Sequence, residues 1–210
     1  MMGLQARVER WHRDERGLSL PELLVATFVF GIVMLIFTST MASVQGAVVR
    51  QENLSQTNDQ ARLALEQLDH EIRSGNVLYD PADEVAPYEA YYTVRLYTQT
   101  NSVTRGSYTC VLWTIDDEGQ LLTRRWPPDN IAGATAWRVV ATGIVNKDLG
   151  VPAFGLDPDP LKGERTLDVE LRVNADLERF PNSTFELSQA LTGRNTSYGY
   201  PVSVCGATPT

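Results

Sequence analysis

The chain has 210 residues, a length that allows one domain with appended segments and a sizeable core. It carries 18 Lys+Arg against 26 Asp+Glu, and 14 basic against 23 acidic residues remain beyond residue 17. This acidic excess argues against direct nucleic-acid binding, which depends mainly on neutralising phosphates. The two histidines and two cysteines lack metal-type spacing, so we expect no metal and no cofactor.

The first 44 residues divide into a charged leader and an apolar segment. Residues 1–17 hold four arginines and three acids, whereas residues 18–44 hold a single charge, Glu22. About 20 apolar residues suffice for a membrane-crossing helix, and arginines before it favour a cytoplasmic N-terminus. We therefore predict one span in a lipid bilayer, with the rest of the chain outside the cytoplasm. An ordinary secretory signal cut near residues 45–47 is the alternative, but its apolar core would be shorter.

The junction of leader and span reads GLSLPELLV over residues 17–25. A carboxylate at the mouth of an apolar segment is costly unless it is neutralised or paired. The pattern resembles the prepilin-type cleavage and methylation motif of type IV pilins and type II secretion pseudopilins. The resemblance implies that a prepilin peptidase cuts between Gly17 and Leu18 and methylates the amine of Leu18. It also implies that Glu22 pairs with the N-terminal ammonium of a neighbouring subunit, although Glu22 could instead bond to its own helix N-terminus.

Beyond the span, the sequence predicts that the helix continues. Five apolar residues recur at helical spacing on one face, namely Leu54, Ala61, Leu65, Leu68 and Ile72. Gly75 and Asn76 form a stop signal, so we expect one helix from about Ser19 to Ser74. The run DQARLALEQLDHEIRSGNV at 59–77 resembles the end of the first helix in PulJ/PilW-type minor pilins.

After residue 76 the apolar period changes to two, which indicates strands. Candidate strands lie at residues 91–99, 107–115, 119–126, 136–143, 165–175 and 184–192, with a hairpin turn at 116–119. Their alternation favours an antiparallel sheet with one face covered by the helix stripe and one face wet. The expected fold class is α+β and pilin-like. The expected regions are a leader (1–17), a transmembrane half-helix (18–44), an amphipathic half-helix (45–75) and an outer domain of five to seven strands (76–210).

Two further features concern the outer domain. Cys110 and Cys205 can form a disulfide outside the cytoplasm, and two buried free thiols are the alternative. The proline-rich loop at 151–164 holds Asp157, Asp159 and Glu164, which could bind calcium, although turn chemistry alone explains Asp-Pro pairs.

The outer domain has no histidine, nucleophile elbow or phosphate loop, so the sequence does not predict an enzyme. The resemblance implies a minor pilin or pseudopilin that primes or caps a type IV pilus or a type II secretion pseudopilus. Its partners would be the prepilin peptidase, other minor and major pilin subunits and the inner-membrane assembly platform. It would reside in the inner membrane and then in the filament. Two alternatives remain: an uncleaved single-pass binding domain, and a pilus adhesin or DNA-uptake component.

Overall fold

The computed structural model describes residues 19–99, 108–157, 165–193 and 203–209. The chain divides into two compact units, residues 1–50 and 51–210. One helix, α2 (Leu20–Arg73), contributes to both units. Its bounds match the helix expected from the sequence to within a residue at each end. The match is this close because no proline after the first turn, and no pair of glycines, interrupts the helix.

The first unit is the apolar part of α2. The best 18-residue window of this helix has a mean hydropathy of 2.4, and none of that window is buried within the chain. By length and composition the helix can therefore cross a membrane. The hydroxyls of Thr27, Thr38, Ser39 and Thr40 donate to carbonyls three or four residues back. These bonds leave no hydroxyl of the four unsatisfied in an apolar environment.

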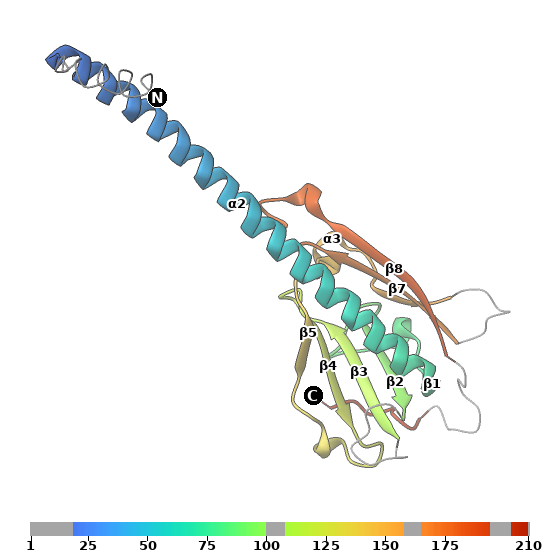
Figure 1. The fold of residues 1–210 in the computed structure, drawn as a ribbon. Helices are drawn as coiled ribbons and strands as arrows, with labels where there is room; N and C mark the ends of the chain where they lie inside the picture. Colours follow the sequence, from blue (N-terminus) through green and yellow to red (C-terminus); the bar gives the residue numbers. More distant parts are fainter. Residues whose placement is uncertain (1–18, 100–107, 158–164, 194–202, 210) are drawn as a thin grey trace, which may run out of the picture. The chain divides into compact units, whose positions relative to one another are not determined.

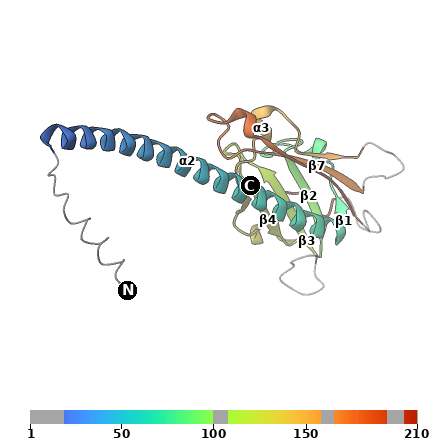
Figure 2. The same cartoon turned by 45° about the horizontal axis from the view of Figure 1, so that its top comes forward.

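The second unit packs the remaining part of α2 against antiparallel strands (Figures 1 and 2). The larger sheet has the order β1-β2-β3-β4-β5 and the smaller one the order β6-β7-β8. Their bounds are β1 (Gly75–Leu78), β2 (Thr93–Thr98), β3 (Thr109–Ile115), β4 (Leu121–Trp126), β5 (Arg138–Ala141), β6 (Phe154–Leu156), β7 (Thr166–Val173) and β8 (Phe185–Thr192). Short helices η1 (Pro81–Asp83), η2 (Ile131–Gly133), α3 (Asn146–Leu149) and η3 (Pro181–Ser183) lie in the connections.

The α+β class expected from the sequence is confirmed, but the single sheet is replaced by two. The six expected strands correspond to β2, β3, β4, β5, β7 and β8. Two further strands were missed, because β1 overlaps the helix stop signal and β6 lies inside the proline-rich loop. Both are too short, at four and three residues, to show an alternating pattern.

The main core lies where α2 meets the inner faces of both sheets. The buried helix residues include Ala61, Leu65, Leu68 and Ile72, as the stripe predicts, whereas Leu54 is only half-buried. The core also contains alternate residues of the strands, among them Val111, Trp113, Leu167, Val169 and Leu171. Burial of these side chains supplies the main free energy that holds the helix to the sheets.

A buried carboxylate on α2 was not anticipated. Glu71 has no exposed surface, and it accepts hydrogen bonds from Trp113 Nε1 at 2.7 Å and Gln67 Nε2 at 3.0 Å. It also forms an ion pair with Arg125 of β4. Burial raises the pKa of Glu71, and the nearby Arg125 guanidinium opposes that rise. Glu71 therefore ties the last turn of α2 to two neighbouring strands.

The outer face of the larger sheet is covered as well, which corrects the expectation of a wet face. Val77, Tyr97, Cys110, Leu112, Trp126 and Cys205 form a second buried cluster there, which we call the outer-face cluster. The sequence pattern missed it because Cys205 is brought in from the C-terminal segment, far from the strands in sequence.

We predict that Glu71→Ala lowers the free energy of unfolding by about 3 kcal/mol, because Arg125 is then left largely buried without its partner. Urea unfolding of the full-length chain in detergent, followed by tryptophan fluorescence, measures this loss. The matched control is Glu66→Ala, an exposed position on the same helix, for which we expect a change within about 0.5 kcal/mol. Equal effects of the two substitutions would contradict the anchoring role of Glu71.

Candidate functional site

The start of α2 carries the residues that the sequence motif singles out. Leu20 is the first helical residue, and Leu23 N donates to Ser19 O at 3.1 Å, which closes the first turn. Pro21 fits this turn because its missing N–H would have no partner there. Glu22 lies in the same turn with its side chain exposed. Gly17 and Leu18, the expected cleavage site, lie outside the described residues.

The position of Glu22 suits a contact with a positive group. It is the acidic residue in the first turn of α2, and the next acid along the helix is Glu52. No ion pair of Glu22 occurs within the described residues, so its carboxylate is free to accept one from outside the chain. An amine a few residues upstream, on this chain or on a neighbour, would match its charge.

The C-terminal segment 203–209 lies against the outer face of the larger sheet and is fixed by a disulfide. Cys110 of β3 bonds to Cys205, with a Cα–Cα distance of 5.8 Å. Arg95 Nη1 donates to the carbonyls of Cys205 at 2.8 Å and Gly206 at 3.1 Å. The structure therefore contains the expected disulfide and not the alternative of two buried free thiols.

Aromatic and charged side chains also bind the C-terminal segment 203–209. Cys205 N donates to Tyr79 Oη at 2.9 Å, and Tyr88 Oη donates to the carbonyl of Pro209. Arg95 lies 4.3 Å from the centre of the Tyr79 ring and forms an ion pair of 3.1 Å with Glu84. Burial raises the pKa of Glu84, and Arg95 opposes the rise. The segment is thus part of the folded domain and not a loose tail.

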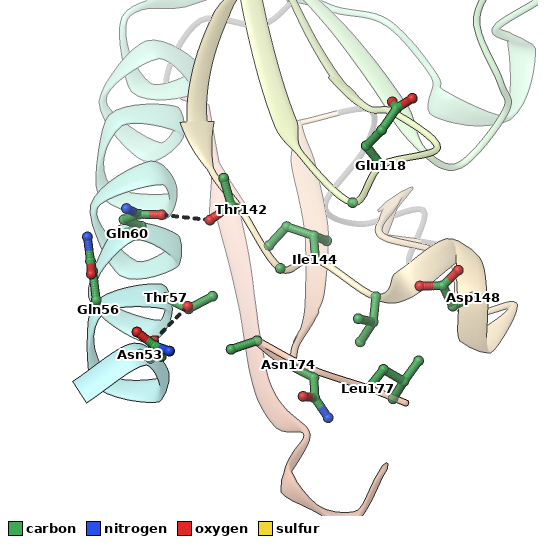
Figure 3. A pocket seen from close by; sticks show the side chains of 14 residues that line it. Asn53, Gln56, Thr57, Gln60, Glu118, Thr142, Ile144, Asp148, Asn174 and Leu177 are labelled. Atoms are coloured by element: carbon green, nitrogen blue, oxygen red, sulfur yellow. Dashed lines mark hydrogen bonds between the residues drawn. The ribbon is translucent and has the colours of Figure 1, made fainter. Parts of the chain in front are cut away.

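A polar pocket of about 500 Å³ lies between α2 and the ends of β5 and β7 (Figure 3). Gln60 and Thr142 face each other across it, with a hydrogen bond of 3.2 Å from Thr142 Oγ1 to Gln60 Oε1. Gly143 is at φ +71°, and a Cβ there would lie 2.8 Å from Thr57 Cγ2, so only glycine fits this junction. The polar groups of the lining are amides, hydroxyls and carboxylates beside apolar residues such as Ile144 and Leu177, and the lining includes no histidine or cysteine. Such a pocket can hydrogen-bond polar groups but offers no nucleophile paired with a base.

The calcium hypothesis gains no support within the described residues. No group of three or more His, Cys, Asp or Glu side chains there is arranged to hold a metal ion. Asp157 follows β6, and its backbone N–H bonds to Thr166 O at 2.9 Å. Asp159 and Glu164 lie outside the described residues.

Comparison with known families finds one match. Residues 12–38 match the model of the prokaryotic N-terminal methylation motif. This prepilin-type motif supports the type IV pilin and pseudopilin family, and it implies processing by a prepilin peptidase and assembly with other pilins. Together with the apolar first unit of α2, it fits membrane anchoring and incorporation into a pilus. The comparisons with curated proteins and with solved structures found no match.

We predict that replacing both cysteines with alanine lowers the free energy of unfolding by about 4.7 kcal/mol, the loop-entropy value for a closed loop near 100 residues. The cysteines are 95 residues apart, so the reference value applies directly. Urea unfolding of the full-length chain in detergent gives the measurement. Reductant should destabilise the wild-type chain and leave the double variant unchanged. A double variant as stable as the wild type would show that the disulfide is energetically neutral.

Proposed function

We propose that the chain is a minor pilin or pseudopilin with a structural role and no catalytic activity. The observation that carries this proposal is the methylation motif at 12–38, at the head of a helix that continues into a compact, disulfide-bridged domain. In this role a prepilin peptidase cuts between Gly17 and Leu18. The amide cleavage frees the amine of Leu18, which is then methylated, and the apolar part of α2 remains in the membrane until assembly.

The assembly step depends on Glu22. After cleavage Glu22 is the fifth residue of the chain, one helical turn from the new ammonium. In lipid its charge is costly unless a positive group lies next to it. Pairing with the N-terminal ammonium of a neighbouring subunit neutralises both charges and fixes the axial register of the two helices. Pairing with its own N-terminus would neutralise the same charge but would specify no register between subunits.

The minor-subunit part of the proposal is supported by residues 59–77. The run ARLALEQLDHEIR resembles PulJ/PilW-type minor pilins, and its regularly spaced members are the residues that α2 buries. Ala61, Leu65, Leu68 and Ile72 contact the core, and Glu71 makes the buried ion pair. The resemblance therefore lies in the side chains that attach the helix to the sheets. Within a filament, such a subunit would prime or cap assembly.

A binding function of the outer domain is the second candidate, favoured by the polar pocket described above. In that case the protein would be an uncleaved anchored domain, an adhesin or a DNA-uptake component. The formal net charge of −8 makes unaided DNA binding the weakest of these.

Processing of the N-terminus gives one test of this proposal. We expect the protein recovered from cell membranes to begin at N-methylated Leu18, as measured by intact mass and N-terminal sequencing. A chain that keeps Met1 or Met2 would point to the anchored domain. A start near residue 45 would indicate an ordinary signal peptide and would contradict the proposal that the chain is a pilin.

The role of Glu22 in assembly gives another test. Glu22→Ala should still be cleaved but should be depleted about 10- to 100-fold from sheared surface filaments, because hydrogen bonds to charged groups contribute about 1.5–3 kcal/mol. Immunoblots of the filament and membrane fractions give the ratio. Glu52→Ala, at the next acid on the same helix, serves as the control and should be incorporated normally. Normal incorporation of Glu22→Ala would refute the register role.

A further inference from the structure

Among the described residues, three of the four sheet edges are protected, whereas the edge at β8 is not. β1 and β5 have four residues each, and the register with their neighbours shifts at a bulge. β6 has three residues, and Tyr91 O accepts from the backbone of Ala153 and Phe154 beside it. β8 has eight residues and pairs with β7 in unbroken register. Short length, bulges and covering segments are usual ways in which edge strands avoid unwanted pairing, and the part of the chain that the structure describes gives β8 none of these three.

The hydrogen-bond pattern shows which backbone groups of β8 point outward. Gly193 N donates to Arg165 O, so the odd-numbered residues of β8 bond to β7. Antiparallel bonding alternates, so the N–H and C=O groups of Glu186, Ser188, Ala190 and Thr192 face away from β7. Within the described part of the chain, none of these groups has a hydrogen-bond partner. β8 therefore presents four adjacent pairs of donors and acceptors.

The side chains of β8 do not block this edge. The strand contains no proline, lysine or arginine, which are the residues that commonly prevent pairing. Its one charge, Glu186, forms an ion pair of 2.8 Å with Arg172 Nη1, and Arg172 also pairs with Glu170 of β7. Ser188, Gln189 and Ala190 are exposed, so the middle of the strand is open to solvent.

A groove of about 520 Å³, which we call the edge groove, lies between α2 and the start of β8. Its lining is mainly polar and includes Asn58, Asp59 and Arg62 of α2, whereas Leu54 and Phe185 are its apolar members. The Arg62 guanidinium lies 5.8 Å from the centre of the Phe185 ring and has no carboxylate partner among the described residues. A strand added to β8 would project alternate side chains over this groove, which suits polar residues, one of which bonds to Arg62.

We propose that the free edge of β8 binds an extended strand of another pilin-type subunit, with polar side chains over the edge groove, one of which bonds to Arg62. This inference rests on the proposed function, because the motif implies assembly with other pilins. The backbone groups of β8 would supply affinity, and the edge groove would supply specificity for the added strand.

The test removes one outward-facing backbone N–H of β8 and leaves the hydrogen bonds between β8 and β7 in place. Ser188→Pro removes the central outward donor, and edge positions of this kind tolerate proline. In cells that assemble the filament, we expect the variant to be cleaved normally and depleted at least about tenfold from sheared filaments, a loss of about 1.4 kcal/mol. Ser188→Ala keeps the N–H and should be incorporated like the wild type. Normal incorporation of Ser188→Pro would overturn the proposal.

A second variant guards against misfolding. Thermal unfolding of the purified full-length Ser188→Pro chain should give a Tm close to that of the wild type. If the Tm falls markedly, Ala190→Lys takes its place, because a lysine at an edge prevents pairing without altering the backbone. Depletion of Ala190→Lys supports the proposal, and normal incorporation overturns it.

Cross-linking identifies the occupant. A full-length chain with Ala190→Cys is treated in cells with a short thiol cross-linker, and the adduct is analysed by mass spectrometry. A partner that itself carries a prepilin-type methylation motif supports the proposal. A second copy of this chain, a protein without that motif, or no adduct overturns it. If instead the wild-type chain is neither cleaved nor found in filaments, the proposed function fails, a result separate from normal incorporation of Ser188→Pro.

Discussion

The buried carboxylate of Glu71 is the constraint on which the arrangement of the outer domain depends. A charge without exposed surface is stable only with partners, and here the partners come from one helix and two strands. Apolar contacts could be satisfied by several rotations of α2 over the sheet, because the hydrophobic effect has no direction. The bonds to Trp113 and Arg125 are directional, so they select one rotation and one axial position. The edge groove and the polar pocket both follow from that choice, since each is lined by residues of α2.

The two parts of α2 meet different solvents. The first unit is apolar, and the hydroxyls of Thr27, Thr38, Ser39 and Thr40 are satisfied within the helix, as suits a segment in lipid. The part beyond residue 50 is apolar on one stripe and polar elsewhere, as a helix on a sheet must be. Glu22 is the exception in the first unit, and it lies in the turn where a positive group could neutralise it. The helix α2 thus carries Glu22 in its first turn and the residues that pack on the sheets in its last turns.

The outer domain closes its own surfaces in most places and leaves them open in two. The C-terminal segment covers the outer face of the larger sheet and is fixed there by the disulfide and by Arg95. Two short, bulged strands and a covering segment protect three sheet edges. The edge of β8 and the edge groove beside it remain open among the described residues. An unprotected edge strand exposes a protein to aggregation unless a partner covers it. In a protein whose motif implies assembly with other pilins, an interface is the more consistent explanation of such an edge.

The sequence by itself determined the elements whose signals are local. The length of α2, the hairpin turn at 116–119 and six of the eight strands follow from periodicity and turn chemistry, which act between near neighbours, whereas the motif at 17–25 is identified by its resemblance to the prepilin-type motif. The two cysteines could be paired because there were only two. Tertiary structure alone decided the split into two sheets, the covering of the outer face and the burial of Glu71. These depend on residues far apart in sequence, such as Glu71 with Arg125 and Cys110 with Cys205, and no local pattern encodes such contacts. The open edge of β8 is of the same kind, because a strand is an edge only in relation to the strands that lie beside it.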